Sequence, residues 1–353
     1  MPKVHASTGL RILIAATLMI GGMLSWRQDR LLAVMGLASA AAISAFTRPA
    51  ILAYNRGRER WLKQDMPGAV EQLSLALQQD PHLTNAYLLR GKAYFALDQV
   101  PQALADFNRA IELAPRQLEP YYYRALMRIG QEDVEGAIAD FTQLVELRPS
   151  ATHHLSLARL LAQQGSLTTA LTHLDEVIRL DPTSADVYSQ RASLHGYLGE
   201  WDAALADWSE AIRLDPSPAL YYNRGVTYYC ADRYDEAIAD LGRSLEGEPQ
   251  QPNTLYNRGN ALYLLGEIKA ALDDYDRAFR IEADLNRVDL SDEYGLYGRG
   301  VAYCNMGDRA TAFADLQAAL ALCRKHHNLA LAEHIRWLLL RLGDPNLEGE
   351  QSA

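Results

Sequence analysis

The chain repeats one pattern of hydrophobic and polar positions. Within residues 218–249, apolar or small residues recur every three or four positions in two successive stretches: Tyr221, Gly225 and Tyr228, then Ala237, Leu241 and Leu245. This spacing is typical of an α-helix with one buried face. The pattern therefore predicts two helices of about a dozen residues each, packed against one another.

The same pattern returns eight times. An alanine marks each copy: Ala69, Ala103, Ala137, Ala170, Ala204, Ala237, Ala271 and Ala312. A small residue precedes each alanine by twelve positions: Gly57, Gly91, Ala125, Ala158, Ala192, Gly225, Gly259 and Gly300. In six copies a proline follows twelve positions later: Pro81, Pro115, Pro149, Pro182, Pro216 and Pro249. Small residues let helices approach and proline ends them, so stacked helix pairs are expected to share a core.

Over about residues 50–325 these columns closely resemble the tetratricopeptide repeat family. The resemblance implies an all-α, right-handed α-solenoid of eight helix-turn-helix repeats, with the first helix of each repeat on an inner wall. We expect a capping helix at 326–343 and a disordered tail at 344–353. The repeats begin near residues 50, 84, 118, 151, 185, 218, 252 and 293.

Two charged columns run through the repeats. An arginine is followed sixteen positions later by an aspartate in six of them: Arg90 and Asp106, Arg124 and Asp140, Arg191 and Asp207, Arg224 and Asp240, Arg258 and Asp274, Arg299 and Asp315. Repeat four has Leu157 and His173, so both charges are missing together, whereas repeat one keeps Arg56 and has Gln72, a neutral acceptor. A partly buried guanidinium needs a carboxylate, so we predict structural ion pairs within repeats rather than a row of ligand-binding arginines.

The face opposite the core offers a groove for a protein or peptide segment. Tyrosine supplies contact area and asparagine can bond to a peptide backbone. The predicted groove residues are Tyr54, Asn55, Arg58, Trp61, Lys92, Phe95, Tyr122, Tyr222, Asn223, Tyr229, Tyr256, Asn257, Asn260 and Tyr263.

The first 48 residues have a different pattern. Two uncharged apolar runs, 12–26 and 31–47, are joined by RQDR, and with flanks from residue 10 each approaches the roughly 20 residues that span a bilayer. We expect a membrane anchor of two transmembrane helices, about 10–26 and 31–47. The two helices would make the chain an integral membrane protein. Basic residues in their outer flanks favour a repeat domain in the cytoplasm. A cleaved signal peptide is the alternative interpretation.

Net charge narrows the choice of partner. The chain has a formal net charge of −10, but residues 1–60 have a net charge of +6 and the remaining residues one of −16. An acidic body repels phosphate backbones, so no nucleic acid partner is expected.

Catalytic chemistry is not expected. The sequence has no zinc-protease, hydrolase, phosphate-loop or dinucleotide motif, so we predict no enzyme, no cofactor and no metal site. His153 and His154, like His326 and His327, are expected at surface or cap positions, because adjacent helical residues do not face one site.

The sequence thus predicts a membrane-anchored scaffold for protein–protein interaction, with assembly or localisation of a membrane complex as its role. The alternative is an envelope-biogenesis protein with its repeats outside the cytoplasmic membrane. An enzyme is the least favoured hypothesis, since no appended catalytic domain follows the eighth repeat.

Overall fold

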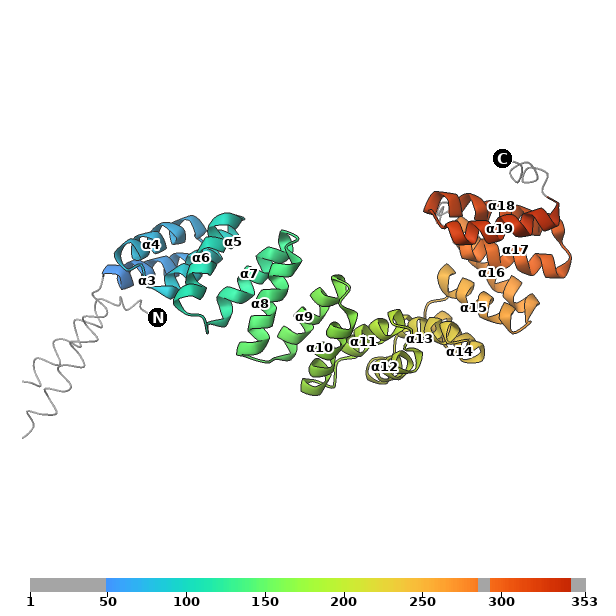
Figure 1. Ribbon diagram of the computed structural model, residues 1–353, viewed down its shortest axis with the longest axis horizontal. Helices are drawn as coiled ribbons and strands as arrows, with labels where there is room; N and C mark the ends of the chain where they lie inside the picture. The colour runs from blue at the N-terminus through green and yellow to red at the C-terminus, as the bar shows by residue number, and fades with distance from the viewer. Residues whose placement is uncertain (1–48, 285–292, 344–353) are drawn as a thin grey trace, which may run out of the picture. The chain divides into compact units, whose positions relative to one another are not determined.

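The computed structural model describes residues 49–284 and 293–343. These residues form seventeen α-helices and no strand, which confirms an all-helical repeat fold (Figure 1). The chain divides into two compact units, Met1–Arg148 and Pro149–Ala353, each considered by itself.

The described part of the first unit contains three helix pairs: α3 (Pro49–Leu62) with α4 (Met66–Gln79), α5 (Thr84–Ala96) with α6 (Val100–Leu113), and α7 (Leu118–Gly130) with α8 (Val134–Leu147). The second unit contains five pairs and a last helix: α9 (Ala151–Gln163) with α10 (Leu167–Leu180), α11 (Ala185–Tyr197) with α12 (Trp201–Leu214), α13 (Pro218–Cys230) with α14 (Tyr234–Gly247), α15 (Pro252–Leu264) with α16 (Ile268–Asp284), α17 (Glu293–Met306) with α18 (Arg309–His326), then α19 (Leu329–Leu342). Within each unit the second helix of a pair also packs on the next pair.

Each pair reverses direction through one residue with left-handed backbone. These residues are Gln64, Asp98, Glu132, Gly165, Gly199, Asp232, Gly266 and Gly307. Each stands five positions before the alanine of its repeat, so the turn residues recur with the same period as the buried alanines. Four are glycine, the residue that adopts positive φ without steric cost.

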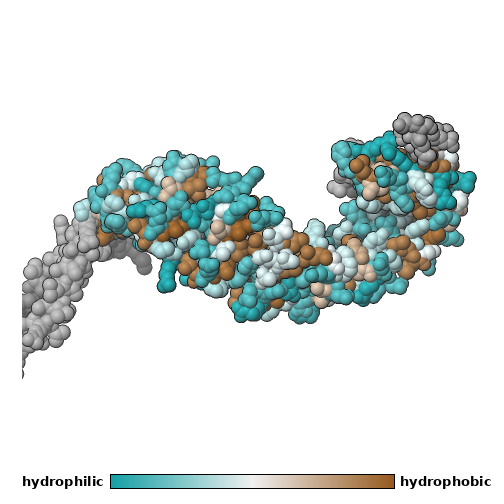
Figure 2. Space-filling view, viewed as in Figure 1, coloured by the Kyte–Doolittle hydropathy of each residue, from teal (hydrophilic) through white to brown (hydrophobic). Residues whose placement is uncertain are grey.

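Close approach of the paired helices depends on the small-residue column. A Cβ on Gly225 would lie 2.8 Å from Cγ of Leu241, so any side chain there would force α13 away from α14. Ala237 and Leu241 are fully buried at the same crossing. Figure 2 shows hydrophilic residues over much of the visible surface of both units, with hydrophobic residues in separate patches between them.

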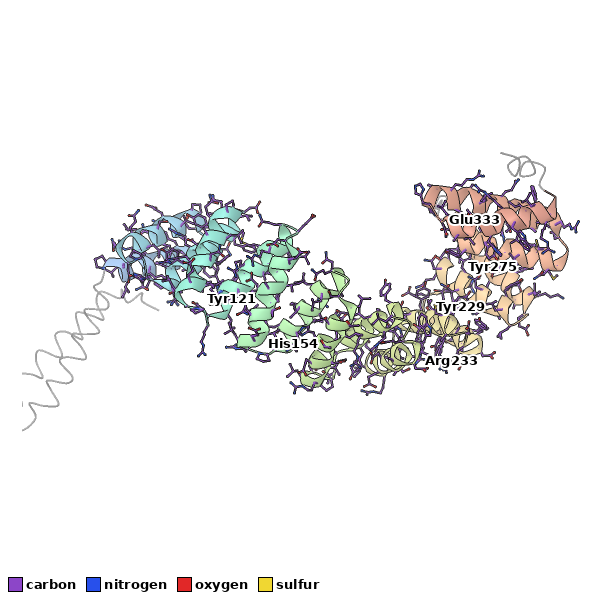
Figure 3. The ribbon with its side chains drawn as sticks, in the orientation of Figure 1. Tyr121, His154, Tyr229, Arg233, Tyr275 and Glu333 are labelled. Atoms are coloured by element: carbon purple, nitrogen blue, oxygen red, sulfur yellow. The ribbon has the colours of Figure 1, made fainter. Side chains whose placement is uncertain are left out.

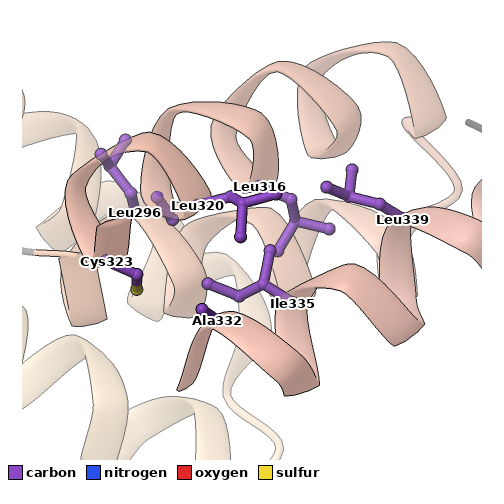
Figure 4. Packing of buried hydrophobic residues seen from close by; sticks show 8 residues of the cluster. Leu296, Leu316, Leu320, Cys323, Ala332, Ile335 and Leu339 are labelled. Atoms are coloured by element: carbon purple, nitrogen blue, oxygen red, sulfur yellow. The ribbon is translucent and has the colours of Figure 1, made fainter. Parts of the chain in front are cut away.

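Helix α19 covers the apolar side of the last pair. Its Ala332, Ile335 and Leu339 pack with Leu316 and Leu320 of α18 (Figure 4). The helix ends at Gly343, whose φ of 85° is left-handed. Its exposed side carries Glu333, His334 and Arg341, so α19 is amphipathic.

The prediction of an integral membrane protein is corrected by the described helices. None of those within 49–284 and 293–343 combines the length and the apolar character needed to cross a membrane. The physical reason is that they are amphipathic, with charged residues on their outward sides. The predicted anchor, 12–26 and 31–47, lies outside the described residues, as do the tail at 344–353 and the segment 285–292.

Candidate functional site

Arg224, on the first helix of its pair, is held by Asp240 of the second. Its Nε donates to Oδ2 at 2.6 Å and its Nη2 to Oδ1 at 2.9 Å, a two-point contact. The side chains are 14% and 5% exposed. The rings of Tyr221 and Tyr228 each lie 5.8 Å from the guanidinium carbon. The hydrogen bond with Asp240 raises the pKa of Arg224, so the guanidinium stays charged and partnered.

The other predicted pairs share this geometry. Nε and Nη2 of the arginine both donate to the carboxylate in five further cases: Arg90 and Asp106, Arg124 and Asp140, Arg191 and Asp207, Arg258 and Asp274, Arg299 and Asp315. All six aspartates are buried. We call these the arginine–aspartate clamps.

The clamps also connect neighbouring repeats. In five of them Nη1 of the arginine donates to a side chain on the preceding second helix; the acceptors are Ser74, Asn108, Asp175, Ser209 and Asp276. In the sixth, Gly242 faces Nη1 of Arg258, and a Cβ there would lie 3.8 Å from it. Five of the six clamp arginines therefore connect three helices, with Nε, Nη1 and Nη2 all donating to protein side chains.

Repeat four replaces the clamp with two histidines. Leu157 is buried where the arginine would stand, and Nδ1 of His173 lies 3.0 Å from Nδ1 of His154. His154, labelled on α9 in Figure 3, is 6% exposed, so its predicted surface position is wrong. Burial lowers the pKa of both imidazoles. A neutral pair can share one N–H···N bond, which suits an uncharged interior.

In the first unit the predicted groove residues lie on α3, α5 and α7. Exposed members are Asn55, Arg58, Phe95 and Tyr122, and half-buried members are Tyr54, Trp61 and Lys92. Nζ of Lys92 bonds to Glu119 at 2.8 Å and lies 4.6 Å from the ring centre of Tyr123. The ammonium is thus engaged within the unit.

In the second unit three cavities open along the first helices. The first, about 230 Å³, lies between α9 and α11; the second, about 290 Å³, between α11 and α13. The third, about 190 Å³, lies among α13, α15 and α17. Ser193 lines both the first and the second, and α13 lines both the second and the third. We call this row of cavities on α9, α11, α13, α15 and α17 the first-helix face.

Four predicted groove residues line these cavities: Asn223 in the second, and Tyr229, Asn260 and Tyr263 in the third. Two others contact each other, since Nδ2 of Asn257 donates to the phenol oxygen of Tyr222 at 3.2 Å. Tyr256 must be removed from the groove. It is 1% exposed and packs in the core beside Ala271, because α15 turns this residue inward.

The third cavity is lined mainly by tyrosine. Tyr229, Tyr263, Tyr294 and Tyr297 surround it together with Asn260 and the apolar Leu264, Gly298 and Val301. Burial raises the pKa of Tyr229 and of Tyr297. The phenols of these two residues are therefore neutral at physiological pH. We call this the tyrosine cavity; Tyr229 on α13 is labelled in Figure 3.

Internal hydrogen bonds hold the tyrosine cavity in place. Oδ1 of Asn260 accepts from the buried phenol of Tyr275 at 2.7 Å, and Nδ2 of Asn305 donates to Tyr263 at 2.6 Å. Gly298 makes room for the first of these bonds, because a Cβ there would lie 2.7 Å from both bonded oxygens. The cavity wall is thus largely preformed.

Sequence reasoning missed five of the eight residues that line this cavity. Tyr294, Tyr297 and Val301 belong to the eighth repeat, which follows the insertion around 286–292. Tyr297 is the fifth residue of its repeat, as Tyr222 and Tyr256 are of theirs, and this column could have revealed it.

Within the described part of the chain, no group of three or more His, Cys, Asp or Glu side chains could hold a metal ion. Burial raises the pKa of Cys304 and of Cys323, so neither thiol is activated as a nucleophile.

Comparison with known proteins is consistent with this geometry. Models described as tetratricopeptide repeat match residues 84–117, 124–185, 190–253, 252–284 and 299–336. A curated human relative, tetratricopeptide repeat protein 13, is 30% identical over 130 residues. That match covers 37% of this chain and only 14% of the relative.

Solved structures share the fold at low identity. The C-terminal part of a TPR repeat-containing protein from Cytophaga hutchinsonii aligns with a TM-score of 0.55 and 19% identity, over 67% of this chain and 95% of that one. YrrB, described as a TPR protein with an unusual peptide-binding site, aligns with a TM-score of 0.46 and 20% identity, over 51% of this chain and 94% of that one.

Proposed function

This chain belongs to the tetratricopeptide repeat family, and we propose that it is a protein-interaction scaffold that binds an extended segment of a partner along its first-helix face. The observation that carries the proposal is the row of three cavities in the second unit. An extended chain fits successive cavities with successive side chains, whereas a compact ligand would use one.

The chemistry of the face supports a peptide ligand. Across α13 and α15 it presents amides and phenols, among them Asn223, Asn257 and Tyr263. Amides can donate to and accept from a peptide backbone at the same time. The clamp arginines face the neighbouring second helices instead, so the proposal assigns them no ligand.

The proposal concerns binding of proteins and not catalysis. We propose that the chain helps to assemble partner proteins. The predicted membrane complex is not part of the proposal, because it depended on residues outside the described ranges. In the first unit the proposed partner surface has Phe95 and Tyr122 as its exposed aromatic residues.

The test is affinity capture from the source cells with the full chain and with Asn223→Ala/Asn257→Ala. Asn260 is left intact, because it accepts the hydrogen bond of buried Tyr275. The matched control, Thr168→Ala/Glu246→Ala, changes exposed positions on the second helices α10 and α14. For each captured protein, hydrogen exchange of this chain is then measured in the complex, to locate the helices that the partner protects.

We expect a partner that both the unaltered chain and the control retain and that the asparagine variant releases. Its binding should slow hydrogen exchange in α11, α13 and α15. A partner held equally by all three proteins, with protection elsewhere, would contradict the proposal.

A further inference from the structure

We propose that the tyrosine cavity is a site for a cationic side chain, and that it takes the arginine or lysine head of a partner segment lying on the first-helix face. This inference rests on the proposed function and adds the chemistry of one side chain to it. The cavity is lined by four tyrosines from α13, α15 and α17 and contains no charged lining residue. Aromatic rings attract cations through their quadrupoles.

Hydrogen bonds within the protein engage the hydroxyl groups of two of the four tyrosines, so a ligand would contact mainly their rings. The hydroxyl of Tyr263 accepts from Asn305 at 2.6 Å, and that of Tyr294 accepts from Asn328 at 3.0 Å. These bonds orient two of the rings before any ligand arrives. A preformed wall reduces the entropy lost on binding.

Charge around the cavity favours a cation. The carboxylate of Asp232 is close enough to Tyr229 to contribute, after burial, to raising the pKa of that phenol. Glu293 immediately precedes Tyr294 and is held by His326 at 2.9 Å. Residues 149–353 carry 18 Lys and Arg against 30 Asp and Glu, a net charge of −12. A basic segment would be attracted to this unit, and an acidic one repelled.

The nearby arginines do not compete for the cavity. Arg233 bonds to Glu236 at 2.7 Å, and Arg299 bonds to Asp315 at 2.7 Å. The guanidinium of Arg299 lies against the ring of Phe279, 3.7 Å from its centre. Arg233 and Arg299 thus both have internal partners, as do Arg224 and Arg258, the clamp arginines of α13 and α15.

The experiment compares peptides that differ at one central residue. Nine-residue glycine-serine peptides carry either arginine or citrulline, which has the same shape without the charge. Their affinities for the full chain are measured by titration calorimetry at low and moderate salt. Cation–π attraction of about 0.5–2 kcal/mol predicts that arginine binds roughly 2- to 30-fold more tightly. The preference should shrink as salt is added.

Variants distinguish an aromatic site from an apolar one. Tyr297→Phe and Tyr263→Phe keep the rings and should keep the arginine preference. Tyr297→Leu and Tyr263→Leu keep apolar volume and should lose it. Trp337→Leu, at an exposed aromatic residue of α19 outside the first-helix face, is the matched control and should behave like the unaltered chain.

Equal affinity for the two peptides would overturn the inference, and so would a preference that survives in both leucine variants. If both peptides bind equally and Asn223→Ala/Asn257→Ala releases them, the result contradicts the cation site but supports peptide binding along the first-helix face. If neither peptide binds, the cation site falls, and the capture experiment above decides the proposed function separately.

Discussion

The pairs α13–α14 and α9–α10 belong to the same unit but are joined by opposite chemistry. In α13–α14 the charged groups of Arg224 and Asp240 bond at two points, at 2.6 and 2.9 Å. In α9–α10 a leucine and two histidines occupy this region, and the imidazoles of His154 and His173 lie 3.0 Å apart. Both pairs nevertheless bury an alanine at the helix crossing, Ala237 and Ala170.

The difference shows what the repeat requires of these two columns. A buried position tolerates a charge with its partner, or no charge, but not one charge alone. Leu157 therefore stands with His173, just as Arg224 stands with Asp240. The histidine pair has a further consequence, because imidazole is the side chain that gains a proton in mild acid.

Removing one partner of a clamp should have the largest effect. Asp240→Ala leaves the guanidinium of Arg224 buried without its carboxylate, and we expect a loss of about 3–5 kcal/mol in local stability. Hydrogen exchange measured by mass spectrometry on the full chain should show faster exchange in α13 and α14.

The control is Glu246→Ala, an exposed carboxylate on the same helix, which should change stability by no more than about 0.5 kcal/mol. Similar exchange rates in the two variants would show that the clamp contributes nothing beyond a surface charge.

Mild acid should weaken α9–α10 more than α13–α14. Burial lowers the pKa of His154 and His173 in the folded chain, so the unfolded chain binds protons more readily. The stability that the neutral pair confers is therefore complete above the ordinary imidazole pKa of about 6.5 and is lost as the pH falls below it. The charged groups acting on these rings are Glu176, Arg179 and His153.

The measurement is hydrogen exchange at pH 7.5 and 5.5, corrected for the intrinsic rate, with α13–α14 as the internal reference. His154→Leu/His173→Leu removes both titrating groups, and the extra response of α9–α10 should disappear. A response that remains in this variant would assign the effect to other groups.

The smallest effect is expected where a clamp contacts a glycine. Gly242→Ser would place a hydroxyl near Nη1 of Arg258, as Ser74 and Ser209 are placed near their arginines. Better helix propensity and the new hydrogen bond should stabilise α14–α15 by about 0.5–1 kcal/mol.

Gly242→Ala separates the two contributions to this gain. Alanine is the better helix former by about 0.5 kcal/mol, so a serine variant at least as stable as the alanine variant indicates the bond. A serine variant less stable by that full amount would show that no bond forms. Chemical denaturation of the full chain reports both values.

The period of the sequence was sufficient to predict the helix pairs and the aspartate partner of each of the six clamp arginines. Both depend on positions within one repeat, and the columns of Ala237 and Asp240 record them directly. Contacts between repeats were not predictable in this way. The bond from Arg224 to Ser209 depends on how one pair stacks on the next, which no single repeat encodes.

Assignment of helix faces was less successful for the same reason. Tyr222 and Tyr256 occupy one column of the repeat, yet only the second is buried in the core. A Cβ on Gly295 would lie 2.6 Å from the ring of Tyr256, so α17 covers this tyrosine after the insertion between α16 and α17. The insertion changes what packs against repeat seven, and this is where the periodic pattern stops being informative.

A double-mutant cycle on Arg224→Leu and Asp240→Leu tests most directly whether the arginine column is structural. Stability in α13–α14 and partner binding are measured for each single variant and for the double variant. A structural clamp predicts that the two losses in stability are coupled by about 0.5–3 kcal/mol and that the double variant still binds the partner. Additive losses, with binding abolished by Arg224→Leu alone, would show instead that the arginine holds the ligand.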